Sequence, residues 1–68
     1  MELAAKRKAK NITQQQLANA MGVTQTSISM IENRARKPSV TLAKRIAEYL
    51  EFPWTEFYEE DDHDQGTD

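Results

Sequence analysis

The stretch "TQQQLANAMGVTQTSISMIENR", residues 13–34, contains two helix starts separated by one short turn. At the first start, Thr13 and Gln16 have the Thr-x-x-Gln spacing of a capping box. Around this cap, Ile12 and Leu17 occupy the two positions of a hydrophobic staple. Because two independent signals agree on one boundary, the sequence predicts a helix that begins directly after Thr13.

The second start follows at once. Gly22 is the residue type that most easily takes the left-handed conformation at a helix end, so the first of these helices should stop there. Thr24 can cap the next helix, with Val23 and Ile28 again at staple spacing and Ile28 and Ile31 on its buried face. Only "GVT" separates the two helices. Two helices joined by so short a turn have the geometry of a helix-turn-helix.

The rest of the chain up to residue 58 reads as three further short helices. Residues 2–9 form a weaker first helix that should end near Asn11, and Ser39 can cap a fourth helix from about Val40 to Leu50. A short fifth helix is expected after Pro53. The fourth helix carries an apolar stripe at helical spacing: Leu42, Ala43, Ile46, Ala47 and Leu50. We therefore predict a compact all-α fold of five helices, with the helix-turn-helix at helices two and three.

Length and charge divide the chain into a body and a tail. With 68 residues there is room for one domain. Residues 1–58 carry nine Lys and Arg against five Glu, a net charge of +4, whereas residues 59–68, "EEDDHDQGTD", carry six acids and neither Lys nor Arg. We expect a folded domain at 1–58 and a disordered acidic tail at 59–68. A basic body favours a polyanionic partner, although a solvated mixed surface would also explain this modest excess.

Several classes of protein are disfavoured. The chain has no Cys, no signal peptide at "MELAAKRKAK" and no apolar run long enough to cross a bilayer, so we expect a cytoplasmic protein that makes no use of the membrane. The single histidine, His63, lies in the tail, and no Gly-rich phosphate loop or separated carboxylate pair occurs in the body. We expect neither an enzyme nor a cofactor, and no metal site, because the acids around His63 lack spaced ligands on a scaffold.

Residues 14–33 resemble the DNA-binding helix-turn-helix of the lambda repressor/Cro-like family, also called the XRE family. Gln14 stands at the opening position of the family motif, Ala18 at its small residue and Gly22 at its turn. Its five buried positions are matched by Leu17, Met21, Val23, Ile28 and Ile31. The resemblance continues through "ENRARKPS", "LAKRIAEYL" and "WTEF". It implies double-stranded DNA as the partner, with the second helix of the motif in the major groove.

The exposed face of that second helix supplies the candidates for base readout. Gln25 can form the bidentate amide pair with adenine, and the methyl group of Thr26 can touch a thymine methyl. Ser29 and Met30 lie one turn further along and are the next candidates. Met30 could equally fill a gap in the core, because its side chain is adaptable. Without the motif around it, Gln25 would be explained by a solvated helix N-terminus.

Phosphate contacts are expected at both ends of the motif. Gln14 resembles the family residue that binds phosphate at a helix N-terminus, and Ser27 should bond either a phosphate or its own helix. The segment after the recognition helix offers four more candidates, for which a solvated loop is the alternative: Asn33, Arg34, Arg36 and Lys37. Arg7 and Glu32 stand where the family often has an ion pair between its first helix and its recognition helix.

Two positions depart from the family pattern. Arg34 and Glu51 stand where glycine is common, and a left-handed backbone at Arg34 would cost about 1 kcal/mol unless Asn33 takes the turn in its place.

The aromatic residues near the end of the body suggest a contact surface. Trp54, Phe57 and Tyr58 cluster in a short segment, in a region where the family commonly forms its dimer interface. For Trp54 and Phe57, closing the core is an equally good explanation. We therefore expect a transcriptional regulator, a repressor that binds a near-palindromic operator as a homodimer. The alternative is a protein-interaction module, an antitoxin or an anti-repressor target, that uses this aromatic surface to bind a protein partner.

Overall fold

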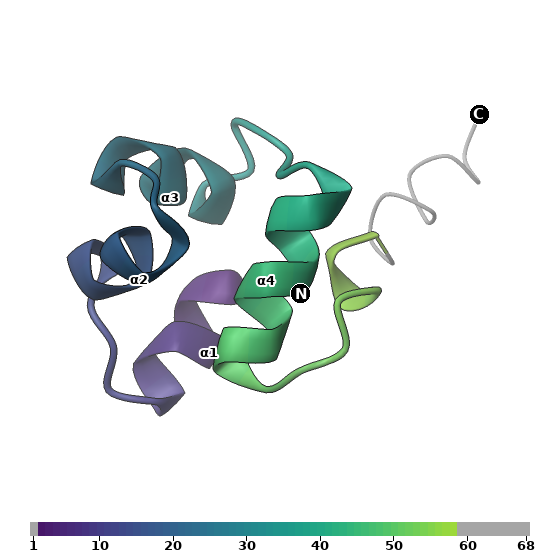
Figure 1. Ribbon diagram of the computed structural model, residues 1–68, viewed down its shortest axis with the longest axis horizontal. Helices are drawn as coiled ribbons and strands as arrows, with labels where there is room; N and C mark the ends of the chain where they lie inside the picture. Colours follow the sequence, from purple (N-terminus) through teal and green to yellow (C-terminus); the bar gives the residue numbers. More distant parts are fainter. Residues whose placement is uncertain (1, 59–68) are drawn as a thin grey trace.

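The computed structural model describes residues 2–58, and the acidic tail at 59–68 lies outside the described residues. The four main helices are α1 (Leu3–Ala9), α2 (Gln14–Met21), α3 (Gln25–Glu32) and α4 (Val40–Leu50). A last helical turn covers residues 56–58. The described part of the chain is all-α and contains no strand, as the sequence predicts (Figure 1). None of its helices is both long and apolar enough to reach across a membrane.

The predicted N-terminal caps of α2, α3 and α4 are confirmed. The N–H of Gln16 donates to Thr13 Oγ1 at 3.0 Å, and the N–H of Thr13 donates back to Gln16 Oε1 at 2.8 Å, which completes the capping box. Thr24 and Ser39 each accept from the N–H three residues on, at 3.1 Å. These bonds satisfy N–H groups that have no partner inside the helix, so they fix where each helix begins.

All four helices end in the same way, with a left-handed residue followed by a return hydrogen bond. The left-handed residues are Asn11, Gly22, Arg34 and Glu51, with φ of 59°, 73°, 63° and 63°. In each case the N–H of the next residue donates to the carbonyl five residues back, at 2.9–3.2 Å, as in a Schellman motif. The left-handed position after α3 is thus Arg34 and not Asn33, whose φ is −85°.

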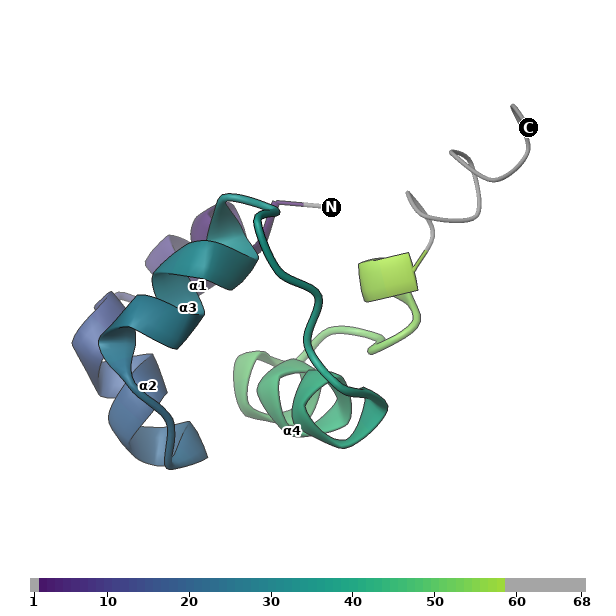
Figure 2. The same ribbon diagram turned by 90° about the horizontal axis from the view of Figure 1, so that it is seen from above.

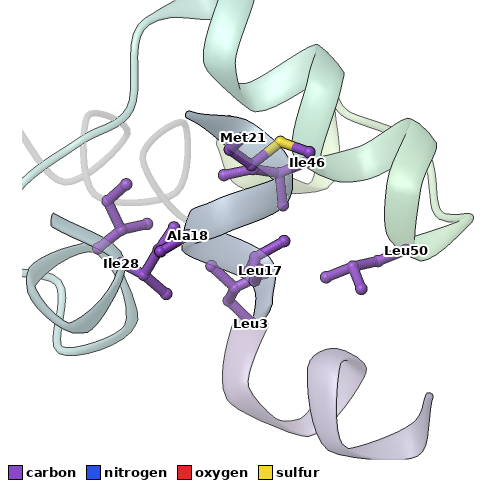
Figure 3. Packing of buried hydrophobic residues seen from close by; sticks show 8 residues of the cluster. Leu3, Leu17, Ala18, Met21, Ile28, Ile46 and Leu50 are labelled. Carbon is purple, nitrogen blue, oxygen red and sulfur yellow. The ribbon is translucent and has the colours of Figure 1, made fainter. Parts of the chain in front are cut away.

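The core lies where α2 meets its neighbours. It consists of Leu3, Leu17, Ala18, Met21, Ile28, Ile31, Ile46 and Leu50 (Figure 3). Leu17, Ile28 and Ile46, one each from α2, α3 and α4, are fully buried. The first residue of each staple, Ile12 or Val23, packs against this cluster from outside. Because the apolar side of α3 packs against α2, its other side faces away from the core.

The helices form two groups, joined by a crossing segment. Seen from above, α1, α2 and α3 lie together, and residues 33–39 cross from α3 to α4 (Figure 2). Contacts of α3 with α1 and α2 hold the first group together, and contacts of α2 with α4 join it to the second. The arrangement leaves the N-terminal end of α3 beside the N-terminal end of α2.

Candidate DNA-binding surface

The second helix of the motif, α3, has a buried side and an exposed side. Ile28 and Ile31 are buried, whereas Gln25, Thr26 and Met30 are exposed. Ser29, on the same side as Gln25, is half-buried. Met30 lies outside the core cluster and retains 38% of its exposure. The structure thus places all four candidates for base readout away from the fully buried interior, and it does not use Met30 as a core filler.

Gln25 is held by a side chain from the neighbouring helix. Its Nε2 donates to Gln14 Oε1 at 3.3 Å, and Gln14 Nε2 donates to Glu32 Oε1 at 2.9 Å. The first residues of α2 and α3 are therefore joined side chain to side chain, and both are linked to the end of α3. These two bonds were not predicted from the sequence. The only signal for them was a glutamine at the first position of both helices.

Beneath this link lies the ion pair of Arg7 and Glu32. Arg7 Nε donates to Glu32 Oε2 at 2.6 Å, and a second guanidinium nitrogen lies 3.3 Å from Glu32 Oε1. The third nitrogen donates to the carbonyl of Ile12 at 2.8 Å. The two side chains keep only 9% and 6% of their exposure. Arg7 therefore ties α1 both to α3 and to the loop that leads into α2.

The surroundings of Glu32 keep its carboxylate ionised. Burial acts to raise its pKa, but the hydrogen bonds from Arg7 and Gln14 and the charges of Arg7 and Lys8 outweigh burial. The net result is that the pKa of Glu32 lies below its ordinary value. The acceptor that orients Gln14 is thus a full negative charge at neutral pH, which strengthens the hydrogen bond.

A shallow hollow opens where α1 meets α2, next to Gln25. Its volume is about 470 Å³, and most of its lining residues are of polar or charged type: Arg7, Lys8, Asn11, Ile12, Thr13, Gln14, Gln15 and Gln25. Lys8, Asn11 and Gln15 are not among the DNA-contact candidates that the sequence offers. The hydroxyl of Ser27, a phosphate candidate, accepts a hydrogen bond from Thr24 Oγ1 at 3.0 Å.

The other phosphate candidates lie on the far side of the recognition helix. Asn33, Arg34, Arg36 and Lys37 are all exposed in the segment that follows α3. Arg34 also forms an ion pair with Glu2, at 3.3 Å, between two exposed side chains. The basic segment and the hollow therefore flank α3 at its two ends.

The three aromatic candidates separate into two groups. Phe57 packs against the core and lies 5.5 Å from Phe52, ring centre to ring centre. Trp54 and Tyr58 form an edge-on pair at 5.6 Å, and the Lys44 ammonium lies 5.0 Å from the Trp54 ring centre. Both rings of this pair are half-buried.

Comparison with known proteins agrees with this geometry. A helix-turn-helix family model matches residues 3–57, so the chain belongs to the XRE-like helix-turn-helix family. Proteins of this kind are DNA-binding regulators and not enzymes.

A relative in Bacillus subtilis (strain 168) supports the same assignment. The chain is 43% identical over 58 residues to the uncharacterised HTH-type transcriptional regulator YqaF, a match that covers 85% of this chain and 76% of the relative. No solved structure gives a significant match. The protein is accordingly a DNA-binding transcriptional regulator. Within residues 2–58, no group of three or more acidic, histidine or cysteine side chains is placed to hold a metal ion.

Proposed function

We propose that this regulator is a repressor that binds a near-palindromic operator as a homodimer. In this proposal α3 enters the major groove and its exposed residues read base edges: Gln25, Thr26, Ser29 and Met30. The observation that carries the proposal is the chain of bonds from Arg7 through Glu32 and Gln14 to Gln25. A long amide side chain at an exposed helix end is normally mobile, and ordering it costs entropy on binding. The bond to Gln14 reduces that cost in advance.

Phosphate binding on both sides of α3 would set the position of the helix in the groove. We assign this role to Gln14 and the nearby hollow on one side, and on the other to the basic segment, Asn33, Arg34, Arg36 and Lys37. Ser27 is a further candidate, because its hydroxyl accepts from Thr24 and its own proton remains available to a phosphate oxygen. If each subunit neutralises three or four phosphates, the affinity of a dimer should fall with salt with a log-log slope of about −5 to −7.

We assign the dimer contact to Trp54 and Tyr58, and more weakly to Phe57, which packs against the core. The first two lie outside the core cluster, and amphipathic rings of this kind suit an interface. A two-fold dimer would place its recognition helices about 34 Å apart, one turn of DNA, which requires an operator of two inverted half-sites. Occupation of such a site within a promoter would exclude polymerase.

The test is selection of the full chain against a randomised pool of duplex DNA at about 0.15 M salt, where non-specific binding is weak. We expect enrichment of a near-palindrome with half-site centres about 10 base pairs apart. Enrichment of a single half-site would remove the dimer from the proposal. If no sequence is enriched, the proposal fails as a whole. The Trp54 and Tyr58 pair then favours the second candidate, binding of a partner protein.

A further inference from the structure

Met30 is an unusual side chain for the exposed face of α3. Its neighbour Ile31 is 7% exposed, whereas Met30 is 38% exposed and belongs to no core cluster. Its backbone is nevertheless well fixed, because its carbonyl accepts the Ala35 N–H at 2.9 Å in the return bond that ends α3. A flexible apolar side chain thus projects from a rigid backbone on the side that the proposed function assigns to DNA.

The chemistry of a thioether restricts what Met30 could recognise there. Its sulfur is only a weak acceptor and it has no donor, so it cannot read the hydrogen-bonding pattern of a base pair. Among the groups that bases present in the major groove, the 5-methyl of thymine is the one that favours apolar contact. Thr26 lies one turn earlier on the same side and is also exposed, so the two residues form a short methyl-bearing strip.

We propose that Met30 selects a thymine in each half-site by contact with its 5-methyl group. This inference rests on the proposed function, because it assumes that α3 lies in the major groove. The contact buries about one methyl group from each partner. Loss of the thymine methyl should then weaken binding about fourfold per half-site.

Deoxyuridine provides a direct test, because it pairs as thymine does and lacks only the 5-methyl. In the operator recovered by selection, each thymine is replaced in turn by deoxyuridine, symmetrically in both half-sites. The full chain should lose affinity at the Met30 position by about fourfold per half-site. Met30→Ala should bind the thymine operator with the same loss and should no longer distinguish thymine from deoxyuridine at that position.

Three control variants separate this contact from its neighbours. Met30→Leu keeps an apolar end and should keep most of the discrimination. Gln25→Ala should weaken binding at a different base pair and leave the thymine preference intact. Thr26→Ser removes the competing methyl group but keeps the hydroxyl, so the discrimination at the Met30 position should survive. All three residues are exposed, so none of these substitutions should lower the melting temperature. A melting temperature equal to that of the unmodified chain would confirm that each variant is folded.

The outcomes that overturn the inference differ from those that overturn the proposed function. An enriched operator on which the full chain binds thymine and deoxyuridine equally at every position would overturn the inference alone. The same holds if Met30→Ala keeps the discrimination, or if Thr26→Ser abolishes it. If the selection enriches no operator at all, the proposed function fails and the inference fails with it.

Discussion

Of the ion pairs that attach α1 and its ends to the rest of the protein, two have the same length. Arg7 and Glu32 approach to 2.6 Å, as do Lys10 and Glu51. The first pair retains 9% and 6% of its side-chain exposure, and the second 38% and 74%. An ion pair exposed to water contributes little to stability, because salt and solvent screen its attraction. A buried charge that loses its partner has no interaction left to offset the cost of its burial. Burial, and not distance, therefore decides which pair the fold depends on.

The two pairs also differ in what lies beyond them. Glu32 accepts a hydrogen bond from Gln14, and Gln14 in turn accepts one from Gln25, which we propose reads a base. Glu51 is the left-handed residue after α4, and its side chain only bridges to α1. A change at the buried pair should therefore affect both stability and DNA binding, while a change at the exposed pair should affect neither strongly.

The largest expected effect is that of Arg7→Ala. Removal of one member of a buried pair costs about 3–5 kcal/mol of unfolding free energy. A domain of this size has about that much stability in total, so most of the protein should be unfolded at 37 °C. Circular dichroism during heating measures this directly. An unchanged melting temperature would contradict the role given to the pair.

The double variant Arg7→Met with Glu32→Leu serves as the matched control. It leaves no stranded charge, so it should recover much of the melting temperature lost in Arg7→Ala. It also removes the acceptor of Gln14, so its affinity for the operator should stay below that of the unmodified chain. Recovery of both stability and affinity would show that the network does not position Gln25.

Acid should weaken the fold through the buried pair. The pKa of Glu32 is lowered in the folded state, so the folded protein binds its proton less readily than the unfolded chain. Its contribution to stability is complete above the ordinary pKa of 4.5 and is lost as pH falls through the lower folded value. Urea unfolding between pH 7 and pH 3 should show this loss. The double variant Arg7→Met with Glu32→Leu, which has no carboxylate at this position and no stranded charge, should have a shallower decline below pH 4.5, whereas an unchanged decline would exclude Glu32 as its source.

A smaller effect is expected at the turn between α2 and α3. Gly22 has φ of 73°, and a Cβ added there would meet no other atom within 4 Å. Gly22→Ala should therefore lose about 1 kcal/mol of unfolding free energy from backbone conformation alone. Urea titration would measure it. A loss of several kcal/mol of unfolding free energy would mean that the added Cβ also disrupts packing at the turn.

At the other end of α3 the opposite substitution should be stabilising. Arg34 is left-handed with φ of 63°, so Arg34→Gly should gain roughly 0.5–1 kcal/mol. If Arg34 binds phosphate, the same variant should bind DNA more weakly and reduce the salt slope of a dimer by about 2, one phosphate per subunit. Glu51→Gly, the matching change after α4, should not weaken DNA binding. A shared loss of affinity in both variants would argue against a phosphate role for Arg34.

The smallest effect belongs to the exposed pair. Lys10→Ala should leave the melting temperature nearly unchanged at 0.15 M salt, because exposed pairs contribute little and are screened. Comparison with Arg7→Ala under identical conditions completes the contrast between the pairs. A loss in Lys10→Ala that rivals the loss in Arg7→Ala would contradict the claim that burial decides.

The residues that determine local structure allowed most of the fold to be predicted. The caps at Thr13, Thr24 and Ser39 and the turn at Gly22 depend on neighbours within a few residues, and the structure has each of them. The left-handed turn at Arg34 was foreseen only as one of two possibilities. Sequence spacing does not decide which of two adjacent residues turns the chain.

The hydrogen bonds between the helices of the site were harder to predict. Gln14 is 18 residues from Glu32 and 11 from Gln25, and their contacts exist only once α2 and α3 are packed together. The aromatic residues show the same limit. Phe57 and Tyr58 are adjacent in sequence, yet one packs against the core and the other pairs with Trp54 outside it.

The most direct test of the central claim is the affinity of Gln25→Ala for the selected operator, measured beside the unmodified chain at 0.15 M salt. Each protein is titrated against the operator and against versions with one base pair changed in both half-sites. If Gln25 reads a base edge, the variant should lose about 1–3 kcal/mol per contact and its preference at one base pair, with other positions unaffected. Unchanged affinity with unchanged preference at every base pair would contradict base readout by the N-terminus of α3.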